Sequence, residues 1–320
     1  MNKTVAATIQ EALRQAQKIL LVAHRNPDGD ALGSILGLYG ALVHQWHLTV
    51  ELAIDGEIPQ RLAYLPYFFK IQDGFRPEKF DTVVIMDCGG WKRTGFFDTN
   101  ELNIAWPANL IVIDHHPVSG QTPGIHFLDA RASSTSEVVW ELIREWGVSI
   151  TPEVATCLLT GIASDTGSFQ HTNTTVQTLI AAADLLSRGA NFPRVIEGVM
   201  TGKSPARLKL WGLVLRRMKY DAERNLAVSV VTQQDLRACG ADTTDIEGLA
   251  NLMSCLASAR FALVIHEKPE GGLKGSFRTE QSNIDVKKLA EAMGGGGHVQ
   301  AAGFEVSADL KIEKEGWRVV

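Results

Sequence analysis

Three ionisable residues, Asp114, His115 and His116, directly follow the apolar run 110–113. These four aliphatic residues, with Pro117 just beyond the triplet, predict a buried strand that stops abruptly. A buried strand rarely ends in three polar side chains without a functional reason. Because carboxylates and imidazoles together ligate divalent metal ions, the triplet indicates a metal site at the end of this strand.

Two other apolar runs end in the same way, since His24 follows residues 19–23 and Asp87 follows residues 83–86. In open α/β sheets, ligands bind beyond the carboxyl ends of the parallel strands, so we expect these side chains to meet. Asp165 closes a helix whose apolar residues recur at spacings of three, four and seven. Any one of these residues alone would suit a cap, a turn or a packed core, but their joint occurrence indicates one site. The expected metal ligands are His24, Asp28, Asp30, Asp87, His115 and Asp165.

Four aspartates and two histidines without a thiolate favour manganese, magnesium or iron over structural zinc. Asp28 and Asp30 flank Gly29, so a turn can aim both carboxylates at neighbouring ions, and Asp87 could bridge two ions. Two ions about 3.5–4 Å apart clamp a phosphoryl group and lower the pKa of a bridging water, which gives hydroxide near neutral pH. In-line attack of hydroxide on phosphorus is therefore the expected reaction. His116 need not bind metal and is expected to contact the phosphoryl oxygen or protonate the leaving oxygen. Asp114 is expected to orient an imidazole, whose identity the sequence leaves open.

The elements that must position these residues predict an α/β fold. Helical stretches alternate with strand-like apolar runs, which indicates βαβ units and a mostly parallel sheet with flanking helices. In the expected helix over residues 30–45, Gly33, Gly37 and Gly40 would allow close packing on the sheet. The expected helices span residues 4–16, 30–45 and much of 136–187, and the expected strands lie at 19–23, near 50–54, at 83–86 and at 110–113.

Length and pattern indicate two domains. We expect a catalytic domain at residues 1–190, a helical linker at 191–219 and a smaller α/β domain at 220–320. In the smaller domain, the expected strands lie at 226–231, 261–265, 273–277 and 302–306, and the expected helices at 244–257 and 285–293.

The second domain carries two further motifs. Gly295, Gly296 and Gly297 precede His298 in a glycine-rich segment, where backbone N–H groups can approach a phosphate or base closely and the imidazole adds a donor. A flexible turn is the alternative. Arg278 ends an expected strand and could pair with a phosphate or a carboxylate, or lie in solvent.

The sequence allows two interpretations for each of two segments in the first domain. Residues 133–137 open a helix, where serine and threonine cap the helix or, alternatively, bind phosphate at its N-terminus. The aromatic-rich run 62–69 fits core packing or, alternatively, base stacking.

Composition narrows the class of protein. The 320 residues are 45% hydrophobic, and a formal net charge of −5 is no general nucleic-acid-binding signature, so any polyanion must be bound locally. None of the four cysteines belongs to a Cys-x-x-Cys pair, which indicates reduced thiols. The N-terminus lacks the apolar core of a signal peptide, and no run reaches the roughly 20 apolar residues that span a bilayer. We therefore expect a soluble, cytoplasmic protein.

Together these motifs resemble those of the DHH phosphoesterase family. The resemblance rests on residues 24–33, Asp87, the triplet 114–116 and residues 164–169, and the glycine-rich segment before His298 resembles the family's associated C-terminal domain. It covers nearly the whole chain.

The resemblance implies a two-domain enzyme with a dinuclear site, usually of manganese, with magnesium or iron as alternatives. Asp87, as the shared ligand, and His116, facing the scissile phosphate, would be the catalytic residues. Arg278 and the glycine-rich segment with His298 would hold the rest of the substrate. By the family's pattern, one ion would be held by His24, Asp28 and Asp87, and the other by Asp30, Asp87, His115 and Asp165.

Within the family, a two-domain chain of this length most resembles the branch that degrades very short RNAs from an end and removes the 3′-phosphate of 3′-phosphoadenosine 5′-phosphate (pAp). Short RNA oligonucleotides and small nucleotides are therefore the expected substrates, no membrane partner is expected, and a homodimer is left open. Enzymes that hydrolyse cyclic di-AMP or its linear product pApA are the alternative within the family. A nucleotide-binding regulator with an inactive site is the alternative of another class.

Overall fold

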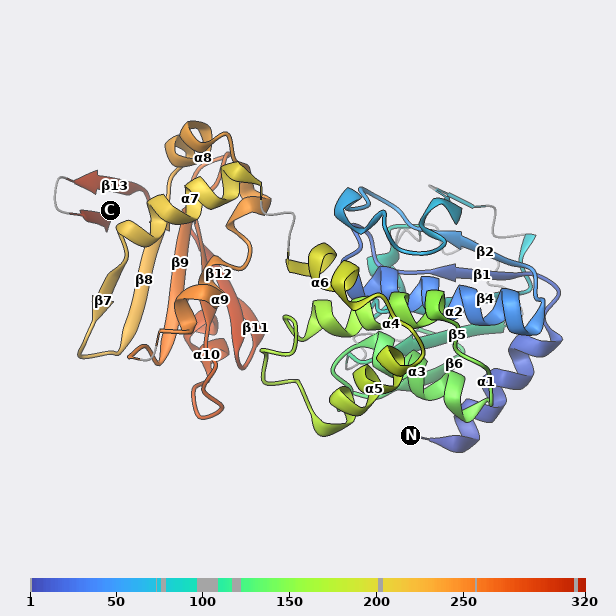
Figure 1. The fold of residues 1–320 in the computed structure, drawn as a ribbon. Coiled ribbons are helices and arrows are strands. Elements are labelled where there is room, and N and C mark those ends of the chain that lie inside the picture. The colour runs from blue at the N-terminus through green and yellow to red at the C-terminus, as the bar shows by residue number, and fades with distance from the viewer. Residues whose placement is uncertain are drawn as a thin grey trace. The chain divides into compact units, whose positions relative to one another are not determined.

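The chain forms two compact units, residues 1–202 and 203–320, which are drawn in Figure 1 and described separately below. The division falls within the stretch 191–219, where linking helices were expected. The computed structural model describes residues 2–72, 74–75, 79–96, 109–116, 122–200, 204–256, 258–313 and 316–320.

The first unit is built on a six-stranded sheet in the order β3-β2-β1-β4-β5-β6, with every neighbouring pair parallel. The expected α/β class and mostly parallel sheet are confirmed. The sequence pattern missed β3 and β6, because the first has only two residues and the second contains a histidine. The strands are β1 Ile19–Val22, β2 Val50–Ala53, β3 Ile71–Gln72, β4 Thr82–Met86, β5 Asn109–Asp114 and β6 Ile125–Leu128.

Helices and short helical turns complete this unit, close to the ranges that periodicity predicted. The helices are α1 Lys3–Gln15, α2 Gly29–Trp46, α3 Thr135–Glu145, α4 Pro152–Asp165, α5 Val176–Ser187 and α6 Phe192–Met200, and the 3₁₀ turns include η1 Gln60–Leu62, η2 Phe68–Lys70 and η4 Trp91–Thr94.

The central strands are buried on both faces, as their uninterrupted apolar runs require. Alternate residues of each strand enter two separate clusters of buried side chains. Val84 and Ile111 belong to the large cluster that the helices cover, whereas Val83 and Leu110 belong to a smaller cluster on the opposite face. Burial on both faces fixes the register, because a one-residue slip would exchange the two sets of side chains.

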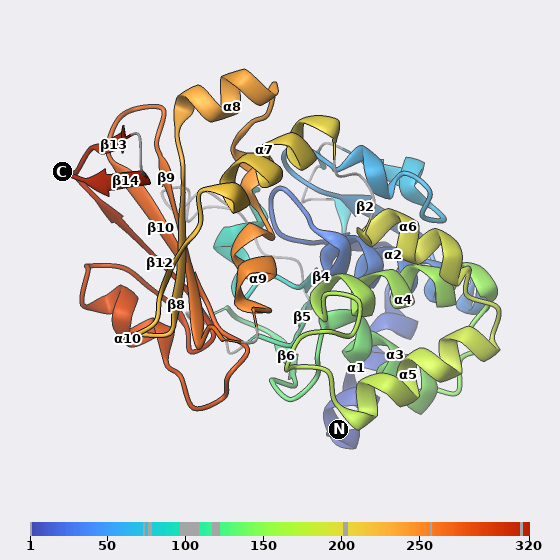
Figure 2. The ribbon, with the colours of Figure 1, turned by 60° about the vertical axis from the view of Figure 1, so that its left-hand side comes forward.

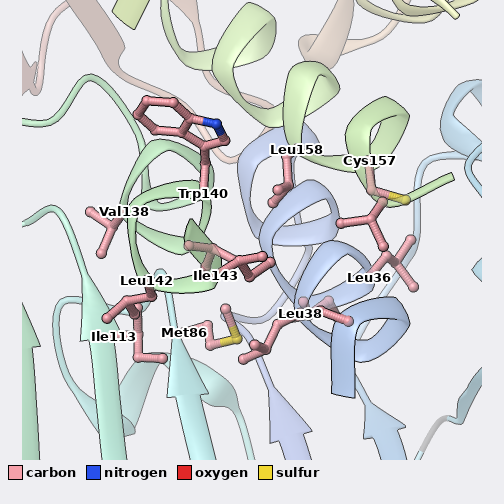
Figure 3. Close-up of a cluster of buried hydrophobic side chains, with 14 of the residues drawn as sticks. Leu36, Leu38, Met86, Ile113, Val138, Trp140, Leu142, Ile143, Cys157 and Leu158 are labelled. Carbon is pink, nitrogen blue, oxygen red and sulfur yellow. The ribbon is translucent and has the colours of Figure 1, made fainter. Parts of the chain in front are cut away.

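Helix α2 packs against the sheet on one side and against α4 on the other. In Figure 3, Leu38 of α2 lies toward Met86 of the sheet, and Leu36 lies toward Cys157 of α4. The expectation that the α2 glycines pack on the sheet was wrong, because they face α4. A β carbon at Gly33 would lie 2.6 Å from the Cys157 carbonyl oxygen. The glycines let the two helix backbones approach closely, and the helix that begins between Asp28 and Asp30 is thereby fixed beside the helix that ends at Asp165.

Gly33→Ala is expected to destabilise the protein by about 1–3 kcal/mol, because the added carbon would meet backbone atoms that cannot move without separating α2 from α4. Gly212→Ala is the matched control, since nothing lies within 4 Å of a β carbon at that position in a helix of the second unit. The control should be neutral or stabilise by roughly 0.5–1 kcal/mol. Urea unfolding of both variants checks the pair, and equal effects would contradict the close-packing argument.

The second unit contains a mixed six-stranded sheet in the order β11-β12-β10-β9-β8-β7, in which only β8 and β9 pair in parallel among the described strands. Helices α7 and α9 cover one face of it and α10 the other, as Figure 2 shows. The elements are α7 Pro205–Arg216, β7 Lys219–Asp221, β8 Leu226–Val231, α8 Gln233–Cys239, η5 Thr243–Ile246, α9 Leu249–Ser254, β9 Phe261–Glu267, β10 Leu273–Arg278, α10 Val286–Glu291, β11 Gly296–His298, β12 Ala301–Val306, β13 Leu310–Glu313 and β14 Gly316–Val319.

One expected element of this unit was wrong. The continuous helix expected over residues 244–257 is broken into η5 and α9, because Gly248 adopts a left-handed conformation with φ of +82°. Glycine reaches this region at no steric cost, and the chain uses it to start a new helix.

Burial answers the open question on the aromatic-rich run. In the aromatic-rich run, Leu62, Leu65 and Phe68 are buried in the core, whereas Phe69 is exposed, so core packing is its main role. All four cysteines are free thiols, as expected. In the described part of the chain, every helix is too short or too polar to cross a membrane.

Candidate metal centre

The carboxyl ends of β1 and β4 bring His24, Asp28 and Asp87 together. His24 Nε2 lies 3.8 Å from Asp28 Oδ1 and 3.8 Å from Asp87 Oδ2. Asp28 is the N-cap of α2, where its Oδ1 accepts hydrogen bonds from the backbone N–H groups of Asp30 and Ala31. The parallel strands therefore deliver one imidazole and two carboxylates to one place, at the edge of the sheet that the sequence predicted.

A second group, Asp30, His115 and Asp165, lies on the other side of Asp87. His115 Nε2 is 3.4 Å from Asp165 Oδ2 and 3.8 Å from Asp87 Oδ1. Ligand atoms within each of the two groups lie within 4.8 Å of one another. Asp87 turns one carboxylate oxygen toward His24 and the other toward His115, so it stands between the two groups.

The N-terminus of α3 holds two of these carboxylates in place. The backbone N–H groups of Thr135 and Ser136 donate to Asp30 at 2.6 and 2.9 Å, and the Thr135 hydroxyl donates to Asp87 Oδ1 at 3.0 Å. Ser134 caps the helix by accepting from the Glu137 N–H, as the capping alternative expected. The alternative of phosphate binding at this N-terminus was wrong, because the Asp30 carboxylate already occupies these donors.

Asp114 orients His116. Its Oδ1 lies 2.9 Å from His116 Nδ1 and accepts the His116 backbone N–H at 2.8 Å, while Oδ2 accepts from the N–H groups of Cys88 and Gly89. Since an ionised carboxylate only accepts, His116 Nδ1 must carry a proton, which leaves Nε2 free to face a substrate. Asp114 thus orients an imidazole, as expected, and the structure identifies that imidazole as His116.

The aspartates of the cluster repel one another in the absence of cations. Burial and the neighbouring Asp30 and Asp28 carboxylates raise the pKa of Asp87 well above its usual value, and the same causes raise the pKa of Asp165 to about 9. Burial opposes ionisation of Asp28, yet contacts with His24 and the Ala31 N–H lower its pKa to about 2. This much buried negative charge is costly unless cations offset it.

Two further observations fit a cation in this cluster. The buried His115 Nε2 has no hydrogen-bond partner in the described part of the chain. Buried polar atoms usually have such a partner, so this nitrogen is available to bind a metal ion. Asp87 has φ of +54°, a conformation that is uncommon for residues other than glycine and that concentrates at functional sites. The donor set, with oxygen ligands in excess over imidazole, suits a hard or borderline divalent ion.

The proposed substrate residues of the second unit share one face of its sheet. Arg278 on β10 and His298 on β11 both pair with Ala301 of β12, which lies between their strands. Directly opposed residues in antiparallel pairs project to the same face, so the two side chains lie level with each other. A β carbon at Gly297 would lie 2.5 Å from the Ala301 carbonyl oxygen, which explains why this strand must contain glycine.

Family comparisons agree with this architecture. Residues 18–162 match the model of the DHH family, N-terminal domain, and residues 224–314 match that of the DHHA1 domain. The bifunctional oligoribonuclease and PAP phosphatase NrnA of Thermus thermophilus is 31% identical over 92% of this chain and 86% of the relative. The cyclic-di-AMP phosphodiesterase GdpP of Geobacillus thermodenitrificans is 26% identical over 95% of this chain and 47% of the relative.

A solved structure shares the fold of nearly the whole chain. The exopolyphosphatase-related protein of Bacteroides fragilis superposes with a TM-score of 0.84 at 29% identity, covering 95% of this chain and 91% of that chain. The matched domains, the 31% identity to the Thermus thermophilus relative and the shared fold agree with the two groups of His and Asp side chains found at the strand ends. The chain therefore belongs to the DHH family and carries its N-terminal domain together with a DHHA1 domain.

Proposed function

We propose that the protein is a metal-dependent phosphoester hydrolase that degrades short RNA oligonucleotides and removes the 3′-phosphate of pAp. The observation that carries this proposal is the presence of two ligand groups at the carboxyl edge of the parallel sheet, with Asp87 in one group and within 3.8 Å of His115 in the other. The relatedness to a bifunctional oligoribonuclease and PAP phosphatase supports the choice of substrates.

The proposed ligands would hold two divalent ions. Two ions in this cluster would act as Lewis acids on the phosphoryl oxygens and would lower the pKa of water between them; manganese is the proposed metal, with magnesium or iron as alternatives. Asp87 would contribute one oxygen to each ion. The proposed ligands are His24, Asp28 and Asp87 for one ion, and Asp30, Asp87, His115 and Asp165 for the other.

His116 is the proposed residue that meets the scissile phosphoryl group. Asp114 fixes its ring so that Nε2 is the free nitrogen. When that nitrogen is protonated it can donate to a phosphoryl oxygen or supply a proton to the leaving oxygen.

A panel of phosphoesters tests the proposed substrates. Purified protein with Mn²⁺ is expected to hydrolyse pAp and RNAs of two to five nucleotides faster than pApA and cyclic di-AMP. Preference for the di-adenosine substrates would favour the second candidate function, which the relatedness to a cyclic-di-AMP phosphodiesterase supports. Failure to hydrolyse any of the four, with Mn²⁺ bound, would contradict the proposal and favour an inactive regulator.

Thr135 is expected to hold Asp87 in its position between the two groups. Thr135→Val keeps the shape but removes the hydroxyl that donates to Asp87 Oδ1, and it should lower kcat and weaken Mn²⁺ binding by roughly 10- to 100-fold. Thr135→Ser keeps the hydroxyl and should stay within severalfold of the parent. Steady-state kinetics and calorimetric titration with Mn²⁺ check this, and equal losses in both variants would exclude the hydroxyl as the cause.

His298 and Arg278, together with Gly295, Gly296 and Gly297, are the proposed substrate-binding residues of the second unit. His298→Ala should lower kcat/KM for pAp by about tenfold or more, because a donor to the nucleotide is lost, while Mn²⁺ affinity stays unchanged. His266→Gln is the control, since this histidine lies on β9 of the same sheet. If both variants matched the parent, the DHHA1 unit would lose its assigned role.

A further inference from the structure

Arg93 of the first unit lies close to the proposed metal ligands and has no role in the function proposed so far. Arg93 belongs to η4, which directly follows the turn at residues 87–90. Its N–H donates to the Gly90 carbonyl at 3.2 Å, and its carbonyl accepts from the Arg25 N–H at 2.7 Å. These bonds tie η4 to the segment after His24, so the backbone of Arg93 is fixed between the ends of two strands that supply ligands.

The guanidinium of Arg93 lies beside Gly89, two residues after Asp87. A β carbon at Gly89 would lie 3.5 Å from Arg93 Nη1 and 3.8 Å from His116 Cβ, so the two side chains lie on the same side of this glycine. Gly89 itself has φ of +58° and donates its N–H to Asp114. The Arg93 side chain therefore lies beside the turn that carries Asp87. Through Gly89, the same turn holds Asp114, the partner of His116.

The guanidinium of Arg93 is available to bind a ligand. Its side chain is exposed, and no hydrogen bond or ion pair joins it to any residue that the structure describes. Neighbouring Arg25, by contrast, is held by Asp55 at 3.0 Å. A free arginine next to a cluster of aspartates, with none of them as its partner, is available for an anion from outside.

The negative charge of the carboxylates and of a bound phosphoryl group favours an additional cation at the site. The two ligand groups contain four carboxylates, whose negative charges two divalent ions would offset, and Asp114 adds a fifth carboxylate beside His116. A phosphoryl group then adds negative charge to a site that is not yet neutral. A guanidinium suits this task better than an ammonium, because its planar fork can donate two hydrogen bonds to two phosphoryl oxygens at once.

We propose that Arg93 binds non-bridging oxygens of the scissile phosphoryl group, next to His116. This assignment rests on the proposed phosphoester hydrolysis and adds to it a substrate-binding residue supplied by the DHH unit itself. It makes Arg93 a residue that recognises the phosphate common to all candidate substrates, whereas recognition of the nucleoside is left to other residues.

The test compares Arg93→Gln with Lys92→Gln, which removes the same charge one residue away, where the ammonium lies 5.9 Å from the Trp91 ring. Arg93→Gln should lower kcat/KM for pAp by roughly 10- to 100-fold and raise the inhibition constant of inorganic phosphate by about tenfold. Calorimetric titration should give parent-like Mn²⁺ affinity, which separates loss of a phosphate contact from loss of a metal site. Lys92→Gln should match the parent in all three measurements.

The outcomes separate the two proposals. If the parent hydrolyses none of the phosphoesters, the proposed function fails; if the parent is active and Arg93→Gln behaves like Lys92→Gln, only the assignment of Arg93 fails. Weakened Mn²⁺ binding in Arg93→Gln would also overturn it. Should this variant not fold, Arg93→Lys answers the same question, because loss of the forked geometry should raise the phosphate inhibition constant severalfold, and an unchanged value would overturn the assignment.

Discussion

Replacing Asp87 with asparagine is expected to lower phosphoester hydrolysis by about a thousandfold or more, which corresponds to ~4 kcal/mol of transition-state stabilisation. Asp87 directs one carboxylate oxygen toward His24 and the other toward His115, so both ligand groups depend on it. An amide offers only one oxygen and no charge, and its NH₂ group would face one of the two positions. Both ions should therefore bind more weakly.

The same substitution should raise the stability of the metal-free protein. Asp87 is 3% exposed and lies among other carboxylates, and burial with the charges of Asp30 and Asp28 raises its pKa well above the usual value. Removing this charge relieves repulsion that no cation offsets in the metal-free state. Asparagine also adopts the left-handed backbone conformation readily, so the φ of +54° is retained without added strain. Thermal unfolding with and without Mn²⁺ measures both effects.

Asp81→Asn is the matched control for this prediction. Asp81 directly precedes β4 and Asp87 directly follows it, so the two residues lie at opposite ends of one strand. The Asp81 carboxylate accepts from the backbone N–H groups of Gln17 and Lys18, and its replacement should affect stability but leave turnover near that of the parent. Full activity in Asp87→Asn, or equal loss in both variants, would contradict a site that is centred on Asp87.

The positions of the strand-end residues could be predicted from the sequence because one rule governs them. Parallel strands place their carboxyl ends at one edge of a sheet, so polar residues that follow buried apolar runs must meet there. His24, Asp87 and His115 obeyed this rule. The assignment of each residue to an ion remains a prediction, since it depends on metals rather than on backbone geometry.

Contacts between elements that are distant in sequence were not predictable in the same way. The hydrogen bond from Thr135 to Asp87 joins residues 48 positions apart and depends on where α3 begins relative to the sheet. Thr135 was visible in the sequence as a neighbour of the helix cap, but the partner of its hydroxyl was not. Likewise, the glycines of α2 were assigned to the sheet because a helix buried on two sides gives no periodic sign of which neighbour each residue faces.

His116→Gln is expected to lower kcat for pAp by about 10²- to 10⁴-fold, the range typical for loss of a group that donates to the reacting phosphate. Mn²⁺ affinity should change little, because the proposed ligands are other residues. His44→Gln is the control, since this histidine lies near the C-terminal end of α2, away from the end that carries Asp30. Strongly weakened Mn²⁺ binding in His116→Gln would instead make His116 a ligand.

Asp114→Asn should act through the same histidine. Asp114 accepts from His116 Nδ1 and from the N–H groups of Cys88 and Gly89, and an asparagine cannot accept on both sides because one of its atoms is a donor. The ring would lose its fixed tautomer, and kcat should fall by roughly 10- to 100-fold. Because this loss arises from a misplaced His116, it should vanish when His116 is already absent. The double variant Asp114→Asn/His116→Gln should thus have the kcat of His116→Gln alone, whereas additive losses would show that Asp114 acts on the reaction by a separate route.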